Sequence, residues 1–423
     1  MSISARRLQR GITHGGAGGS GSLAGLPRVP WEGGPAYWAQ FGKPAAVGWT
    51  DPNFFPMMSF SNSFGSDAEI QWDYDHGVNV YHGLNPWSEY SLLLNHDMYY
   101  VGDPYADVYS NVMMPSTFNR WVAYNTPDEI DGTSATGADA VTAVTSVTDG
   151  YRAQNDGRFI AANYTQLVIR NDWTPYGSQL INHTGVDGVS IDMYWYTIPD
   201  SSYVANNYGN SYVSSVGNLP NPRRAASYGA CVRGMRQVDD TVGQKKPIWM
   251  FVECLSGSPG EQFVRYIAPG ELKGAVMNSI INEARGIMWF NNVASQGYEV
   301  GNVLRQAQVQ GTNFVGYNQV AAMGEIATVV RTLAPVINTQ SYVWSFGSGL
   351  DTMLKVAAGY IYIFAMIDQA SDPGVRILTL PSGVTGSNVE VIGESRNLTV
   401  NGSYQFSDTF AYEYSYHIYK IAL

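Results

Sequence analysis

Eight short apolar runs recur between residues 54 and 292, and most are continuous, with little alternation of apolar and polar positions. A continuous apolar run is typical of a strand that is buried on both faces of a parallel sheet. The eight expected strands are FFPMMSF (54–60), VNVYHGL (78–84), HDMYYVG (96–102), RWVAYN (120–125), RFIAANYT (158–165), VDGVSIDMYW (186–195), PIWMFVE (247–253) and GIMWFNN (286–292).

Segments with helical periodicity lie between these runs. Leu272, Val276 and Ile280, for example, recur at a spacing of four and mark one face of a helix. Eight strand–helix units over roughly 300 residues match the size of a (β/α)8 barrel with loop insertions. The sequence therefore predicts a TIM barrel over residues 35–337, in which the short third strand is the weakest. The expected helices lie at 138–155, 225–240, 269–284 and 319–333, the last one ending at Pro335.

The two ends of the chain have a different pattern. Residues 15–30 are rich in Gly and Ser and then contain Pro, which is typical of a flexible chain. We interpret residues 1–34 either as a disordered terminus or as an arm that becomes ordered only in a partner. Residues 338–423 contain short strands of period two, separated by Gly, Pro, Ser and Asn turns. They predict a small antiparallel β-sandwich.

Composition narrows the class of ligand. Charged residues make up 14% of the chain, against about 25% in an ordinary soluble domain. Aromatic residues make up 13%, including 29 Tyr and 11 Trp. Such a surface suits uncharged polar ligands such as sugars, whose C–H faces stack on rings. The net charge of −11 argues against binding to nucleic acid or to an anionic membrane.

Metal and membrane signals are weak. Two cysteines, Cys231 and Cys254, cannot form a disulfide scaffold, and the six histidines show no zinc-binding spacing, so we expect no metal and no cofactor. No apolar run is long enough to predict a membrane span. The first residues are basic but lack an apolar segment, so we expect no export by a standard signal.

Carboxylates follow three of the expected strands. Polar residues at the C-terminal ends of barrel strands converge on the active-site face. Glu253 closes a wholly apolar strand, where a carboxylate needs a partner. It is a candidate catalytic carboxylate, or alternatively the partner of an Arg in a neighbouring loop. Asp192 is either a second catalytic group or a structural support of its strand end, and Asp128 and Glu129 either carry chemistry or simply begin a helix.

Glycoside hydrolysis needs this kind of set, because one carboxyl group protonates the leaving oxygen while another acts as nucleophile or base. We predict Glu253, Glu129 and Asp192 as catalytic residues. The alternative for each aromatic residue is ordinary packing in the barrel. The predicted substrate-binding residues are Asp128, Asn163, Tyr164, Tyr194, Trp195, Trp289 and Asn291.

Several segments resemble known families. ARGIMWFNN (284–292) and PIWMFVE (247–253) resemble the last two strands of barrel glycoside hydrolases, and 389–421 resembles their appended β-sandwich. RVPWEGGPAYWAQFGKPAAVGWTDPNFFP (28–56) is similar to the start of minor tail proteins of actinobacteriophages, including mycobacteriophages. That resemblance covers nearly the whole chain and is strongest at 28–56, 186–195 and 284–292.

The resemblance implies roles for individual residues. In the largest clan of barrel glycosidases the acid/base follows strand four and the nucleophile follows strand seven, and Glu129 and Glu253 occupy these places. The usual Asn-Glu pair is replaced here by Pro127-Asp128-Glu129, so Asp128 is an alternative acid, and a site that has lost its activity is another.

The resemblance also implies a setting. A phage tail-tip protein is made in the host cytoplasm, resides in the virion, contacts other tail-tip proteins and is present in three copies or a multiple. Its expected partner is host cell-envelope polysaccharide. Three hypotheses result: a glycoside hydrolase, an inactive glycan-binding adhesin, and a purely structural tail component. The carboxylates after the sixth and seventh runs favour the first two.

Overall fold

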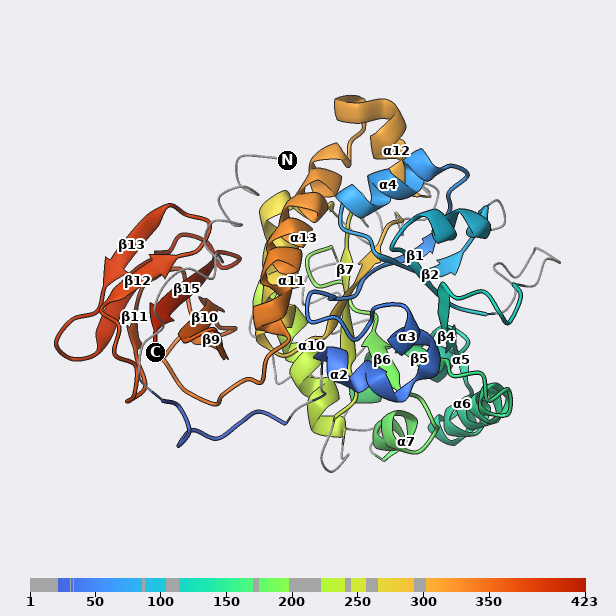
Figure 1. The fold of residues 1–423 in the computed structure, drawn as a ribbon, viewed down its shortest axis with the longest axis horizontal. Coiled ribbons are helices and arrows are strands. Elements are labelled where there is room, and N and C mark those ends of the chain that lie inside the picture. Colours follow the sequence, from blue (N-terminus) through green and yellow to red (C-terminus); the bar gives the residue numbers. More distant parts are fainter. Residues whose placement is uncertain are drawn as a thin grey trace.

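A computed structural model describes residues 22–30, 32, 34–85, 88–103, 114–169, 175–197, 222–239, 245–255, 265–292 and 302–423. Eight parallel strands form a closed barrel in the order β1 to β8, and β1 pairs with β8. The predicted (β/α)8 barrel is therefore confirmed (Figure 1). Its strands are β1 (Met57–Asn62), β2 (Val80–Leu84), β3 (Tyr99–Val101), β4 (Trp121–Asn125), β5 (Phe159–Tyr164), β6 (Gly188–Ile191), β7 (Ile248–Glu253) and β8 (Gly286–Phe290).

Each barrel strand lies within one of the eight predicted apolar runs or overlaps it. Every residue of β5 and β7 is buried, as expected for strands covered on both faces. The third strand has only three residues, and its register with β4 shifts between Tyr100 and Val101. The barrel is thus least regular where its sequence signal is weakest.

Helices surround the barrel, and several of them begin with a side-chain cap. Ser66 accepts a hydrogen bond from the Glu69 N–H at the start of α4, and Thr136 accepts one from Asp139 N–H at the start of α6. The helices are α2 (Gly34–Tyr37), α3 (Gly42–Ala46), α4 (Asp67–Asp75), α5 (Ile130–Thr133), α6 (Gly137–Arg152), α7 (Tyr176–Asn182), α10 (Ala225–Val238), α11 (Pro269–Ile281), α12 (Val303–Gln310) and α13 (Tyr317–Ile337). Shorter 3₁₀ turns are η1 (Trp38–Gln40), η2 (Tyr90–Asn95), η3 (Gln166–Ile169) and η5 (Gly311–Asn313).

The last barrel helix does not end where the sequence predicted. Helix α13 continues through Pro335 to Ile337, so the expected stop at Pro335 is wrong. Proline removes only its own N–H, and the next turn can continue if later N–H groups find acceptors. Asn338 N–H donates to the Ala334 carbonyl, and Thr339 N–H donates to the Val336 carbonyl. The proline therefore lies in the final turn.

Aromatic side chains close the N-terminal end of the barrel. Trp38 lies 4.7 Å from Phe159 and 6.2 Å from Trp249, measured between ring centroids. A Cβ placed on Gly188 would lie 3.1 Å from the Trp249 ring, and one on Gly286 would lie 2.6 Å from it. Glycine at these two strand positions makes room for the indole.

The C-terminal part is a two-sheet antiparallel sandwich, as predicted. A five-stranded sheet in the order β13-β12-β15-β10-β9 faces the pair β11 and β14, and side chains from both sheets share one core. The predicted run MLKVAAGYIYIFAMI forms a hairpin that turns at Ala358 and Gly359. The strands are β9 (Leu350–Ala357), β10 (Tyr360–Ile367), β11 (Gly374–Thr379), β12 (Asn388–Val391), β13 (Arg396–Thr399), β14 (Gln405–Phe410) and β15 (Tyr416–Ala422).

Part of the predicted arm packs against this sandwich. Leu23 is buried in the sandwich core, Val29 N–H donates to the Ser341 carbonyl, and Val343 N–H donates to the Pro27 carbonyl. Residues 22–30 are therefore an ordered part of the C-terminal unit. The expectation of a flexible arm falls, for residues 1–21, outside the described residues.

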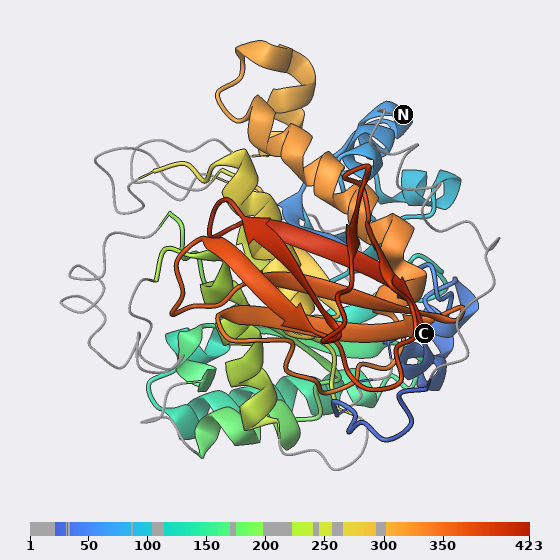
Figure 2. The same cartoon turned by 90° about the vertical axis from the view of Figure 1, so that its left-hand side faces the viewer.

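Helices α10, α11 and α13 stand between the barrel and the sandwich (Figures 1 and 2). The long apolar helix α13, whose most apolar stretch is 61% buried, contacts β9. A buried cluster of charged side chains ties three parts of the chain together. Glu32 accepts two hydrogen bonds from Arg236 and pairs with Arg285 at 3.0 Å, while Lys355 of β9 lies 3.7 Å from Glu283. This contact fixes the sandwich to the barrel.

Candidate active site

The direction of side chains along β7 identifies the face of each strand that points into the barrel. Trp249 and Phe251 both contact rings from strands that are not their neighbours. Trp249 contacts Phe159 of β5, and the Phe251 ring lies 5.4 Å from that of Phe60 of β1. Side chains alternate along a strand, so Glu253 points inward, one layer above Phe251. The same alternation points Asn163 of β5 and Ser190 of β6 inward, and the Ser190 hydroxyl donates to Asn163 Oδ1 at 2.7 Å. The C-terminal end of the barrel is therefore its polar end.

The segment after β4 is held to β5 by two carboxylates. Asp128 accepts a hydrogen bond from Asn163 Nδ2 at 2.8 Å, and Asp131 accepts bonds from the N–H and hydroxyl of Thr165. Glu129, between them, has φ of 47°, a left-handed conformation that costs a non-glycine residue about 1–2 kcal/mol. Such strain is concentrated at functional sites. Glu129 does precede a short helix, as the alternative interpretation held, but its carboxyl group also lies near that of Asp192.

Glu129 and Asp192 form a pair of acids. The two carboxyl groups lie close enough for the charge of Glu129 to act on Asp192, and Tyr194 and Asn163 lie beside Asp192. Burial, with the charges of Asp128 and Asp131, raises the pKa of Glu129 to about 7. Burial, and then Glu129 and Asp128, raises the pKa of Asp192 well above its ordinary value. At neutral pH this pair therefore retains a proton that it can donate.

Glu253 is completely buried at the end of β7. Both of its oxygens lie 2.7 Å from the hydroxyl of Tyr228, which is in the first turn of α10. Burial raises the pKa of Glu253 to about 7, although the hydrogen bonds from Tyr228 and Thr197 oppose the shift. Among the described residues no Arg or Lys forms an ion pair with it, so the alternative of a salt bridge finds no support in that part of the chain.

Tyr194 lies near both acidic groups. Burial raises the pKa of its hydroxyl, and the charges of Asp192, Glu253 and Glu129 raise it further. Its ring lies 4.9 Å from Phe290 and 6.3 Å from Phe251. Phe290 and Phe60 are partly exposed. These rings form an apolar surface beside the carboxylates, as a sugar-stacking site requires.

A histidine packs against one of these rings. His82 of β2 is stacked on Phe60 at 5.6 Å, and its Nε2 lies 3.0 Å from Asn125 Oδ1. Asn125 Nδ2 donates to the Thr126 carbonyl, so its oxygen faces His82 and Nε2 carries the proton. Burial lowers the pKa of His82, which therefore stays neutral beside Asp128. His82 therefore lines the mouth as a neutral hydrogen-bonding residue.

Four of the predicted binding residues lie outside the barrel mouth. Tyr164, Trp195 and Trp289 are 0% exposed, and their polar atoms bond to the Leu180 carbonyl, Cys231 Sγ and the Gly77 carbonyl, respectively. They pack between strands and helices, which is the alternative stated for the aromatic residues. Asn291 is also buried, and its Nδ2 donates to Ser59 on the outer face of β1. None of the four offers a face to a sugar.

Five residues at the mouth were not predicted from the sequence. Tyr228 carried no signal, because its contact with Glu253 joins α10 to β7 over 25 positions of chain. Phe290 did carry one. Gly286 faces the indole inside the barrel, and alternation then points Phe290, and not Trp289, to the same side. The other three are Phe60, His82 and Asn125.

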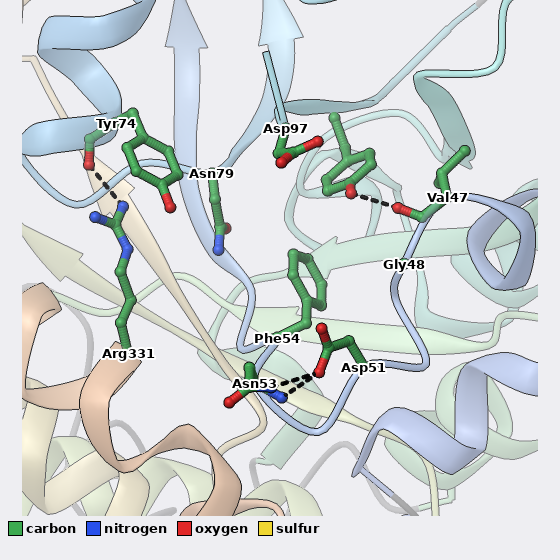
Figure 3. Close-up of a pocket in the computed structure, with 10 residues that line it drawn as sticks. Val47, Gly48, Asp51, Asn53, Phe54, Tyr74, Asn79, Asp97 and Arg331 are labelled. Carbon is green, nitrogen blue, oxygen red and sulfur yellow. Dashed lines mark hydrogen bonds between the residues drawn. The ribbon is translucent and has the colours of Figure 1, made fainter.

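A separate cavity of about 440 Å³ opens at the opposite end of the barrel (Figure 3). Asn79, which precedes β2, and Tyr99, which begins β3, line it, so it lies at the N-terminal ends of the strands. Arg331 donates to the Tyr74 carbonyl there and lies over the Tyr74 ring. The candidate carboxylates lie at or after the C-terminal ends of the strands, so the cavity is not part of this site.

No group of three or more metal-binding side chains occurs among the described residues. The mouth combines carboxylates, amides and aromatic rings, which is the chemistry of a site for neutral polar ligands.

Comparisons with known proteins bear on the fold. No protein-family model matches the chain, and no curated protein matches it. Among solved structures, Eubacterium rectale Amy13B is 9% identical, with 88% of this chain and 96% of that chain covered and a TM-score of 0.52. A structure titled glycoside hydrolase is 9% identical, with coverages of 87% and 92% and a TM-score of 0.52. At this identity the likeness concerns the barrel fold alone. A GH30 endoxylanase from Clostridium papyrosolvens C71 is 11% identical over 94% of this chain and 98% of that chain, with a TM-score of 0.46.

Proposed function

We propose that the protein hydrolyses a glycosidic bond with Glu129 as proton donor and Glu253 as nucleophile or base. The observation that carries the proposal is the pair of environments at the mouth. Glu129 lies beside Asp192 after β4 and retains a proton near neutral pH, while Glu253 is buried at the end of β7 and accepts a hydrogen bond from Tyr228. Two carboxyl groups with separate environments on one barrel face are what this reaction needs.

The reaction begins when Glu129 transfers its proton to the glycosidic oxygen as the bond from that oxygen to the anomeric carbon breaks. Glu253 either bonds to the anomeric carbon or removes a proton from a water molecule that attacks it. In the first case, water later cleaves the ester and Glu129 takes the proton of that water. Tyr194 and Phe290 provide faces on which the sugar ring stacks.

The two routes differ in the separation of the carboxyl groups. A retaining enzyme holds them about 5–5.5 Å apart, and an inverting enzyme holds them about 6.5–9.5 Å apart. We predict that the carboxyl groups of Glu129 and Glu253 are separated by a distance within one of these two ranges. Proton NMR of the first sugar released distinguishes the two routes, because the anomeric configuration is either kept or inverted.

The decisive experiment is incubation of purified protein with mycobacterial arabinogalactan and peptidoglycan, followed by measurement of released reducing ends. Glu253→Gln should remove nearly all release while glycan binding is kept. Glu390→Gln, on the sandwich, is a matched control that should release at the wild-type rate, because Glu390 pairs with Lys420 far from the mouth. Undiminished release by Glu253→Gln would assign the nucleophile elsewhere, with Asp192 the next candidate.

We further propose that the glycan is host cell-envelope polysaccharide and that the protein belongs to a phage tail tip. The sequence resemblance at residues 28–56 and 284–292 supports this setting. Residues 22–30 belong to the folded unit, so a deletion that tests anchoring should remove only 1–21. We expect the truncated protein to fold but to be absent from purified virions analysed by mass spectrometry. Normal incorporation would refute an anchoring role.

An inactive adhesin is the second candidate function, and one observation favours it. Asn163 of β5 uses both ends of its amide on Ser190 and Asp128, so it supports the acids and is not free to bind substrate. Binding of arabinogalactan by wild-type protein without any release of reducing ends would establish the adhesin.

A further inference from the structure

A loop of the sandwich, residues 411–415, docks on the barrel helices beside the candidate site. It joins β14 to β15, and Tyr414 from this loop lies directly on α11. A Cβ on Gly270 would be 2.6 Å from the Tyr414 ring, and one on Gly274 would be 2.6 Å from Tyr414 Cβ. Cβ atoms do not approach other atoms so closely, so the two glycines permit this contact.

Docking brings Glu413 to the start of α10. The Tyr196 hydroxyl donates to Glu413 Oε1 at 2.6 Å, and the N–H of Ala225, the first residue of α10, donates to Oε2 at 2.9 Å. An acidic group at a helix N-terminus satisfies a free N–H and interacts favourably with the helix dipole. Glu413 therefore binds two barrel segments at once, the one after β6 and the one that begins α10.

Two more sandwich contacts hold the same helical turn. Gln369 Nε2 donates to Ser227 Oγ at 2.6 Å, and Arg224 Nη1 donates to the Ser371 carbonyl at 2.6 Å. Hydrogen bonds from the sandwich therefore hold the first turn of α10 at both Arg224 and Ser227. Hydrogen bonds from several elements define its position more tightly than one bond would.

This turn contains Tyr228, which contacts Glu253. The Tyr228 hydroxyl accepts a hydrogen bond from Tyr196 N–H at 3.1 Å and has its own donor directed at the Glu253 carboxyl. The Tyr196 and Tyr228 rings lie 5.7 Å apart. A continuous set of hydrogen bonds therefore runs from Glu413 of the sandwich through Tyr196 and Tyr228 to Glu253.

We propose that Glu413 is a positioning residue of the active site and that the sandwich, through it, holds Tyr228 on Glu253. This inference rests on the proposed role of Glu253. It assigns the C-terminal sandwich a part in catalysis. A carboxylate that loses its hydrogen-bond donor is less well oriented and less stable as the charged form.

The test compares full-length variants Glu413→Ala, Glu413→Gln and Tyr228→Phe, with Glu390→Gln as the control on the same sandwich. Two quantities are measured. One is the pH titration of the Glu253 carboxyl by carbon NMR, assigned with Glu253→Gln. The other is kcat and KM for release of reducing ends. Circular dichroism confirms that each variant is folded.

We expect Tyr228→Phe to move the Glu253 titration to higher pH, and Glu413→Ala to move it in the same direction by less. The titration midpoint in Glu413→Gln should lie between those of Glu413→Ala and wild type, because the amide oxygen keeps one of the two hydrogen bonds. In both Ala and Phe variants kcat should fall about 10- to 100-fold with KM little changed. Glu390→Gln should leave the titration and both kinetic constants at wild-type values.

The outcomes separate the two proposals. If Tyr228→Phe moves the titration and Glu413→Ala does not, the sandwich plays no positioning role, and the proposed function stands. If Glu253→Gln releases sugar as fast as wild type, the proposed function fails, whatever the titration shows. If the Glu253 titration moves in Tyr228→Phe and in Glu413→Ala but wild-type protein releases no sugar, the structural link is supported and its role in catalysis is refuted.

Discussion

Replacing Glu253 by Gln should make the stability of the protein less dependent on pH. The pKa of Glu253 is about 7 in the folded protein, against 4.5 for an unperturbed Glu, so the folded state binds the extra proton between these values. The contribution of this proton to stability is therefore complete below about pH 4.5 and is lost as the pH rises through 7. At 1.36 kcal/mol for each pH unit, the loss is about 3 kcal/mol.

The Glu253→Gln variant has no titrating proton at this position, so only the wild-type free energy of unfolding should contain this loss. The assay is urea denaturation of both proteins at several pH values from 4.5 to 8. The variant should gain about 3 kcal/mol relative to wild type across that interval, because Glu129 and Asp192 titrate in both proteins and cancel in the difference. Glu325→Gln is the control, since its side chain is 63% exposed. Curves for Glu253→Gln and wild type that stay parallel would refute the reasoning.

Three further predictions concern the mouth, the docked loop and the buried charges. The rate of hydrolysis should be greatest near pH 7, where Glu129 is still protonated and Glu253 begins to ionise. Glu129→Gln should lose the fall in rate at high pH. This substitution should slow hydrolysis of an aryl glycoside least, because its leaving group needs no proton. Gly270→Ala should lower the melting temperature, and Tyr414→Ala should rescue it, because only ring atoms of Tyr414 oppose that Cβ; the same rescue should fail for Gly274→Ala, which also meets the Tyr414 backbone. Glu32→Ala should cost about 3–5 kcal/mol in urea unfolding, since two buried arginines lose their shared partner, and a loss below about 1 kcal/mol would show that they find another.

The barrel could be predicted because its signal is local. A strand buried on both faces needs an unbroken apolar run, and the run that ends in Glu253 shows both the strand and its functional end. The sandwich was predictable for the same reason, since alternation and turn residues are properties of neighbouring positions. Helix α13 continues beyond Pro335 because the next N–H groups find acceptors within the same turn. The composition of the segment does not show that these acceptors are in place.

The candidate site was only partly predictable, because its contacts join distant positions. Carboxylates at strand ends identified Glu129, Asp192 and Glu253, but which of them meet depends on loop geometry. The aromatic residues show the limit most clearly. A one-residue step along β8 moves a ring from the barrel interior to its outside, so choosing Trp289 over Phe290 reversed the side on which the ring lies.

The hydrogen bond between Glu413 and Ala225 spans 188 positions of the chain, and this bears on how the protein is made. The ribosome completes all eight barrel strands before it adds the loop that holds the first turn of α10. During synthesis the barrel strands therefore emerge while Tyr228 still lacks its support from the sandwich, and that support can form only after residue 413 has emerged. A chain that stops before residue 413 therefore has every barrel strand but lacks the contact that, in our proposal, positions Tyr228 on Glu253.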